Sequence, residues 1–128
     1  MASECVLLYN CGGPEWVRLR QTLMALRLRV RMVEPRQYGL PLETLASGKA
    51  GEQTAEVEEE FREPMLVFCR LTDTGLDRAL AALRRAGPPQ VGLKAVLTPD
   101  NRGWDSRQLW TELRRERQAW ARSAHASD

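Results

Sequence analysis

Four short apolar runs alternate with amphipathic stretches along the chain. Two of the runs, Cys5–Tyr9 and Met65–Cys69, are apolar at nearly every position, which is typical of strands buried on both faces of a sheet. The run 28–33 instead alternates apolar residues with arginines, and the run 93–97 contains a lysine. These patterns predict two central strands and two edge strands.

Apolar residues at helical spacing follow the first, third and fourth runs. They are Trp16, Leu19, Leu23 and Leu26 in the first stretch, Leu76, Leu80 and Leu83 in the second, and Leu109, Leu113 and Trp120 in the third. Each spacing predicts a helix with one buried face. Asp105 and Gln108 have the spacing of a capping box at the start of the third helix, and residues 40–45 predict a shorter helix that ends near Gly48.

The predicted order is strand, helix, strand, irregular crossover, strand, helix, strand, helix, and two architectures accept it. The first is an α/β fold with a four-stranded, mainly parallel sheet in the order 2-1-3-4 and three or four helices. The second is a ferredoxin-like α+β sandwich in the order 4-1-3-2, with an added C-terminal helix. We favour the first, because strands that are apolar on both faces indicate a sheet covered on both sides. The strand-helix-strand order occurs twice, but no convincing sequence repeat accompanies it.

A parallel sheet would bring the loops after the first, third and fourth strands to one carboxyl edge, where a crevice forms. The residues that we expect to bind a ligand there are Asn10, Gly12, Gly13, Asp73, Thr98, Asn101 and Trp104. Backbone N–H groups of the 10–14 turn would attract an anion at a helix start, although a simple tight turn also explains the glycines. In the ferredoxin-like alternative the first and third strands run in opposite directions, so the first two loops would lie at opposite ends.

The loop 98–104 has a structural interpretation beside the functional one. Asn101 can satisfy backbone groups within the loop, and Trp104 can anchor the loop to the core as the residue before the helix cap. Neither interpretation is excluded by the sequence, and we place the structural one slightly ahead.

Two further features suggest other chemistry. Cys11 precedes a predicted helix, where a thiol pKa is lowered, and with the strand that follows Pro64 it faintly resembles the thioredoxin fold. Position 14 is a proline rather than a second cysteine, which weakens that likeness. The basic helix 106–122 interleaves arginines with tryptophans, a pattern that suits nucleic-acid binding but also an ordinary solvated helix face.

Length and composition narrow the class of protein. A chain of 128 residues, 43% hydrophobic, suits one domain, which we expect over residues 1–122 with a disordered tail at 123–128. No apolar run approaches the roughly 20 residues of a membrane-spanning helix, and the first residues lack the features of a signal peptide, so we expect a cytoplasmic location. Three cysteines without a CxxC pair and a single histidine predict free thiols, with no metal and no cofactor.

Charge is nearly balanced overall, at +2, but it is unevenly distributed. The segment 52–63 is rich in glutamate, and we interpret it as a solvated helix face or a mobile loop. Arginine greatly outnumbers lysine, which suits phosphate or nucleic-acid binding as well as a bias in base composition. Because acidic residues nearly cancel the charge, we favour the compositional explanation.

One group of residues carries a specific resemblance. The run Leu93-Lys-Ala-Val-Leu-Thr98, followed by Asn101 and Trp104, together with Pro64-Met-Leu-Val-Phe68, is similar to a family of small bacterial proteins catalogued as domain of unknown function 3783. The likeness is strongest over roughly residues 64 to 116. The family has no assigned activity, so the resemblance implies a bacterial, cytoplasmic protein and supplies no catalytic residue. Asp100, the arginine-rich second strand and the glutamate-rich insert depart from its pattern.

We therefore expect a non-enzymatic binding or regulatory module that binds a partner protein or a small anionic ligand at the carboxyl edge of its sheet. One alternative is a redox accessory protein that uses Cys11. The other is a nucleic-acid-associated protein that uses the helix 106–122, and of the possible partners nucleic acid is less favoured. We expect no membrane partner.

Overall fold

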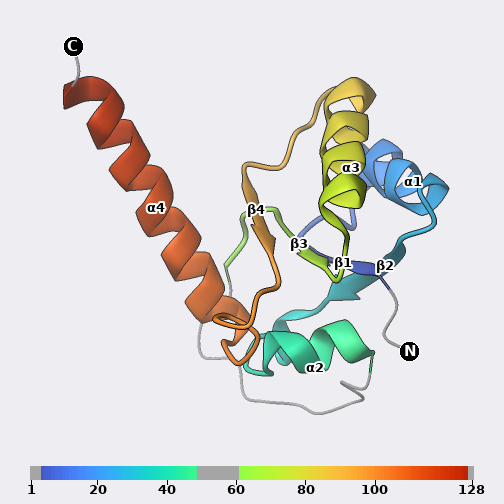
Figure 1. Cartoon of the computed structure of the whole chain (residues 1–128), viewed down its shortest axis with the longest axis horizontal. Helices are drawn as coiled ribbons and strands as arrows, with labels where there is room; N and C mark the ends of the chain where they lie inside the picture. The colour runs from blue at the N-terminus through green and yellow to red at the C-terminus, as the bar shows by residue number, and fades with distance from the viewer. Residues whose placement is uncertain (1–3, 49–60, 127–128) are drawn as a thin grey trace.

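A computed structural model describes residues 4–48 and 61–126. Its strands are β1 (Cys5–Tyr9), β2 (Arg29–Val33), β3 (Met65–Cys69) and β4 (Leu93–Val96), and its α-helices are α1 (Val17–Ala25), α2 (Leu42–Ser47), α3 (Asp73–Ala86) and α4 (Ser106–Ala126). The four strands form one mixed sheet in the order β2-β1-β3-β4 (Figure 1). The α/β class, the strand order and the number of helices expected from the sequence are confirmed.

The direction of the central strands differs from our expectation. β1 is parallel to β2, and β3 is parallel to β4, but β1 and β3 pair antiparallel, with Cys5 opposite Cys69 and Tyr9 opposite Met65. All five residues of each central strand are buried, as the apolar pattern predicted. Burial on both faces nevertheless does not require parallel strands, because helices on the two faces cover an antiparallel pair equally well. The sheet therefore has the strand order of one expected architecture and the opposed central strands of the other.

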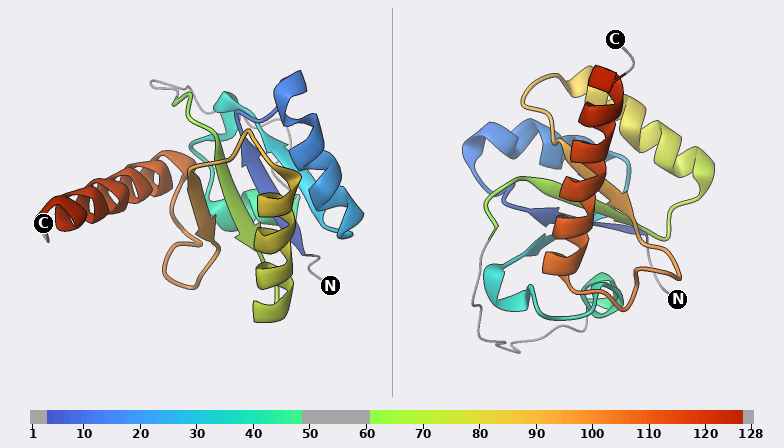
Figure 2. Two further views of the ribbon diagram at one scale, coloured as in Figure 1. Left: turned by 90° about the horizontal axis from the view of Figure 1, so that it is seen from above. Right: turned by 90° about the vertical axis from the view of Figure 1, so that its left-hand side faces the viewer.

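Helices cover both faces of the sheet, and each face has its own core. α1 and α3 lie on one face, while α2 and the first part of α4 lie on the other (Figures 1 and 2). Successive side chains of a strand point to opposite faces, so β1 and β3 contribute to both cores. The α1/α3 core includes Val6, Leu8, Leu23, Leu66, Phe68, Ala79 and Leu83. The α2/α4 core includes Leu7, Tyr9, Tyr38, Leu42, Leu45, Phe61, Val67 and Leu109.

The two halves of the chain have the same order of strands and α-helices. The first half has the order β1, α1, β2, α2, and the second half has the order β3, α3, β4, α4. The two strands within each half are parallel. The antiparallel register in the centre is symmetric about Leu7 and Val67. A residue in the left-handed region follows each central strand, Asn10 with φ of 61° and Arg70 with φ of 64°. The fold thus contains a structural repeat that the sequence did not reveal.

Local signals set most of the helix boundaries. α2 ends at Gly48, whose φ of 75° is readily adopted only by glycine. The hydroxyl of Thr72 accepts a 2.9 Å hydrogen bond from the backbone N–H of Gly75 and caps α3. Asp105 likewise accepts a 2.8 Å bond from the N–H of Gln108 at the start of α4. The backbone of α4 continues to Ala126, past residue 122, where we expected a tail to begin.

No helix within the described ranges is long and apolar enough to span a bilayer. The edge positions of β2 and β4 agree with the polar alternation and the lysine in their sequences. Most of the glutamate-rich segment 52–63 lies outside the described residues.

Candidate functional site

The antiparallel central pair divides the residues predicted to bind a ligand between two edges of the sheet. The carboxyl end of β1 lies beside the amino end of β3, so Asn10, Gly12 and Gly13 lie at one edge. Asp73, Thr98, Asn101 and Trp104 follow β3 and β4 and belong to the other edge. Our expectation that three loops surround a common crevice was therefore wrong, because it depended on parallel central strands.

The turn after β1 is held by hydrogen bonds within the protein. The side-chain amide of Asn10 donates to the carbonyls of Phe61 and Glu63, both at 3.0 Å. The guanidinium of Arg20 donates to the carbonyls of Cys11 and Gly13, at 2.7 and 3.0 Å. The turn therefore presents carbonyl oxygens to an arginine, and its contacts agree with a tight structural connection.

Asn101 lies at the centre of the hydrogen bonds that hold the loop after β4. This residue is only 8% exposed. Its Oδ1 accepts a 2.8 Å bond from the N–H of Thr98, and its Nδ2 donates to the carbonyl of Val96 at 3.0 Å. The N–H of Asn101 donates to the hydroxyl of Thr98 at 3.2 Å. These bonds use the functional groups of both side chains within the loop, as the structural interpretation of Asn101 predicted.

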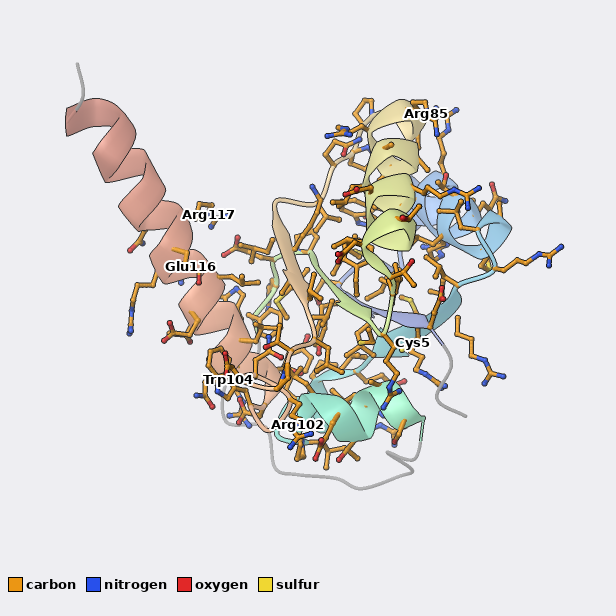
Figure 3. All side chains as sticks on the ribbon, in the orientation of Figure 1. Cys5, Arg85, Arg102, Trp104, Glu116 and Arg117 are labelled. Carbon is orange, nitrogen blue, oxygen red and sulfur yellow. The ribbon has the colours of Figure 1, made fainter. Side chains whose placement is uncertain are left out.

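The same loop supports the start of α2. The N–H of Leu42 donates to the carbonyl of Trp104 at 2.8 Å, and the N–H of Glu43 donates to the carbonyl of Arg102 at 3.0 Å. The first turn of a helix has N–H groups without partners in the helix itself, and these two bonds satisfy two of them. Trp104 is partly buried against the α2/α4 core, and Figure 3 shows it with Arg102 where the loop meets α2. The loop is thus a structural connection between the two halves.

A hollow of about 410 Å³ lies between α1 and α3, at the edge where β3 ends. Its lining includes Glu4, Arg27, Thr72, Thr74, Gly75 and Arg78. Arg27 has φ of 63° in the turn that joins α1 to β2, and Arg78 lies on the second turn of α3. Both guanidinium groups are exposed, and neither forms an ion pair within the described part of the chain.

The chemistry of this hollow suits an anion. The first N–H groups of α3 point out of its N-terminus, where the helix dipole places partial positive charge. The residues that line the hollow include two arginines and one carboxylate, Glu4. Of the residues predicted to bind a ligand, only Asp73 lies beside this hollow, in the first turn of α3. Arg27 and Arg78 were missed, because the sequence does not show that the α1–β2 turn and α3 meet.

The structure does not support the lowered thiol pKa that the sequence suggested for Cys11. Cys11 is fully buried, its thiol donates to the carbonyl of Tyr9 at 3.3 Å, and burial raises its pKa to about 11. A thiol with a raised pKa is a poor nucleophile at neutral pH, so the structure does not support redox chemistry at Cys11. Cys5 instead has a lowered pKa, of about 6, because of the neighbouring Cys69 thiol and the positive charge of Arg31. Only the antiparallel register shows that these two cysteines are neighbours.

The arginines of α4 are largely engaged within the protein. Arg117 and Arg114 reach Glu63 at 3.0 and 3.4 Å, and Arg114 also stacks over the ring of Trp110, 4.7 Å from its centroid. Arg115 pairs with Glu112 at 3.2 Å. Three arginines of this part of the helix are thus paired with glutamates, two of them with the same residue, Glu63. The side chains of Trp120 and Arg122, which the sequence placed on the same helix, lie outside the described residues.

Comparison with known proteins concerns the second half of the chain. Residues 64–120 match the family described as a domain of unknown function, DUF3783. The resemblance expected from the sequence is therefore confirmed over β3, α3, β4 and most of α4. Neither the curated proteins nor the solved structures contain a match to the chain. The family description names no activity, so the geometry of the hollow carries the functional argument.

Proposed function

We propose that the protein is a non-catalytic binding module that binds a small, multiply charged phosphate compound in the hollow between α1 and α3. The observation that carries the proposal is the meeting of Arg27 and Arg78, neither of which has an ion-pair partner among the described residues, at the N-terminus of a 14-residue helix. A guanidinium donates two parallel hydrogen bonds to a phosphate, and backbone N–H groups at a helix start donate further ones.

Thr72 and Thr74 add hydroxyl groups to the lining of the hollow. The hydroxyl of Thr72 already accepts the capping bond from Gly75, so it can still donate one hydrogen bond to a ligand. A hollow of about 410 Å³ lies within the range of sites that hold small molecules. It has room for a diphosphate or a small phosphorylated metabolite.

The proposal keeps the small anionic ligand expected from the sequence and moves its site to the edge formed by β3 and the start of α3. It assigns no catalytic residue, since the lining combines arginines and threonines with a single carboxylate. We expect the module to act in the cytoplasm and to regulate or sequester its ligand.

Binding is tested by titrating the protein with inorganic phosphate, pyrophosphate and ADP, measured by calorimetry and by thermal unfolding. We expect pyrophosphate to bind and to raise the Tm by several degrees at concentrations far above Kd. Arg78→Ala should weaken binding at least tenfold, because a charge-assisted hydrogen bond contributes about 1.5–3 kcal/mol. Glu4→Gln should strengthen binding, because it removes the negative charge from the lining.

Arg85→Ala is the matched control. Arg85 is exposed at the opposite end of α3, so the substitution removes the same charge from the same helix far from the hollow (Figure 3). It should leave the affinity unchanged. Equal weakening by Arg78→Ala and Arg85→Ala, or no binding of any of the three anions, would contradict the proposal.

A further inference from the structure

We propose that Cys5 and Cys69 form a reversible redox pair, which a low-molecular-weight disulfide oxidises to a disulfide bond across the two central strands. This pair lies on the α2/α4 face of the sheet and is independent of the hollow between α1 and α3. Both cysteines have free thiols and are fully buried.

The register places the two residues directly opposite each other, as the first residue of β1 and the last residue of β3. Glu4 and Phe68 direct their carbonyls to the outer strands, so the next residues, Cys5 and Cys69, direct theirs to each other. They therefore occupy a hydrogen-bonded pair, for which the Cα atoms are about 5.5 Å apart. That Cα separation lies within the range found in disulfides, but the side chains of a hydrogen-bonded pair are farther apart than those of a non-hydrogen-bonded pair. The two Cβ atoms must therefore move closer together for the bond to form.

The surroundings favour a thiolate on one member of the pair. The Cys5 thiol donates to the carbonyl of Ala46 at 3.6 Å, and the Cys69 thiol donates to the carbonyl of Val67 at 3.7 Å. The neighbouring Cys69 thiol, together with the positive charge of Arg31 on strand β2, lowers the pKa of Cys5 to about 6, and the proximity of Cys5 raises the pKa of Cys69. The thiolate form is therefore favoured on Cys5 rather than on Cys69.

A second hollow is lined by neighbours of the buried pair, although neither cysteine lines it. It has a volume of about 300 Å³ on the β2 side, and its lining includes Leu7, Arg31, Leu45 and Gly48. Arg31 belongs to this lining and also lowers the pKa of Cys5, so the hollow and the pair share this residue. Figure 3 shows Cys5 close to the end of α2, where its thiol donates a 3.6 Å hydrogen bond to the carbonyl of Ala46.

The chemistry balances with a small disulfide, RSSR, as the oxidant. The Cys5 thiolate attacks one sulfur, the S–S bond of the reagent breaks, and RS⁻ leaves and takes a proton. Cys5 then carries the mixed disulfide and no negative charge, which removes the main cause of the raised pKa of Cys69. Cys69 loses its proton and attacks Cys5 Sγ, the protein disulfide forms, and a second RSH leaves. The two thiols lose two electrons, and RSSR gains them.

The experiment treats the folded, full-length protein with increasing ratios of oxidised to reduced glutathione. Free thiols are then alkylated under denaturing conditions, and the peptides are mapped by mass spectrometry. We expect a peptide pair linked through Cys5 and Cys69, 2 Da lighter than the reduced pair, with Cys11 still alkylated. The linkage should disappear when reduced glutathione is restored.

Variants separate this pair from general thiol oxidation. Cys11→Ser should form the linkage as the wild type does, whereas Cys69→Ser should stop at the glutathione adduct of Cys5. Arg31→Met, which keeps much of the side-chain volume, should slow the reaction at pH 7 by about tenfold or more, because it removes the positive charge that lowers the pKa of Cys5. Three free thiols in the folded wild type at every glutathione ratio, or a linkage that involves Cys11, would overturn the proposal.

Discussion

The side chain of Asn101 holds the loop between β4 and α4 with two hydrogen bonds, one accepted and one donated. Asn101→Ala leaves the N–H of Thr98 and the carbonyl of Val96 without those partners in a partly buried place. We expect it to lower the free energy of unfolding by about 2–3 kcal/mol, as measured by urea denaturation. Asp100→Ala, at the exposed neighbouring position, should change it by less than about 0.5 kcal/mol. Equal effects of the two substitutions would contradict the role of Asn101.

Gly48 ends α2 in the left-handed region and lies directly against Arg31. A Cβ added at Gly48 would come within 2.5 Å of Nη1 of Arg31. Gly48→Ala therefore combines backbone strain with displacement of the guanidinium, and we expect a loss of about 1–2 kcal/mol in urea denaturation. Gly103→Ala is the matched control, because an added Cβ there meets no atom within 4 Å. A similar loss at both glycines would show that α2 does not depend on this geometry.

The sequence correctly predicted the local role of one residue, but it did not predict which distant residues lie together in the fold. The sequence correctly indicated that Asn101 could bond within its own loop, because asparagine often does so in turns. It could not indicate that Arg27 and Arg78 lie together, since no local pattern links the α1–β2 turn to α3. Cys5 and Cys69 were also separate in the sequence, and only their opposed register makes them a pair.

At the scale of elements, the start of α3 forms part of the proposed binding site, and the capping hydrogen bond of Thr72 can be tested by substitution. Thr72→Ala removes the bond from Thr72 to the N–H of Gly75, and we expect a loss of about 1 kcal/mol in urea denaturation. Thr74→Ala is the control at an exposed position in the first turn of the same helix, and it should have a smaller effect on stability. If Thr74→Ala costs as much as Thr72→Ala, the capping bond is not the reason.

Apolar patterns predicted the elements well and their directions poorly. Two-faced burial identified β1 and β3 as central strands, and the alternation in β2 identified an edge strand. The direction of β3 depends on how the chain crosses from β2, and the irregular segment 34–63 gave no signal for that path. The directions of the strands decide which loops lie at the same edge of the sheet. Because the sequence did not indicate the direction of β3, the prediction of a common crevice was wrong.

At the scale of the whole molecule, two similar halves meet through β1 and β3, and the family match covers the second half together with its helix α4. Each half alone would leave a fully apolar strand without a partner on one side. The central pair is therefore the main structural link between the halves, and the Cys5–Cys69 pair lies at one end of it.

The lowered pKa of Cys5 makes the free energy of unfolding depend on pH. The pKa of Cys5 falls from an ordinary value of 9.0 to about 6 in the folded state, so the unfolded state binds more protons between these values. Under reducing conditions, the free energy of unfolding should therefore rise from pH 6 to pH 9. Cys5→Ser should flatten this rise, and a wild-type stability that falls over the same range would contradict it. Above pH 9 the raised pKa values of Cys11 and Tyr9 act in the opposite direction.

The most direct test of the proposed binding site is to follow backbone amide NMR signals while pyrophosphate is added to the ¹⁵N-labelled protein. If the anion binds between α1 and α3, the amides of Thr74 and Gly75 shift most, together with those around Arg27. Gly12 and Gly13, at the opposite edge of the sheet, keep their positions. Shifts centred on Gly12 and Gly13, or no saturable shift at the start of α3, would contradict the account.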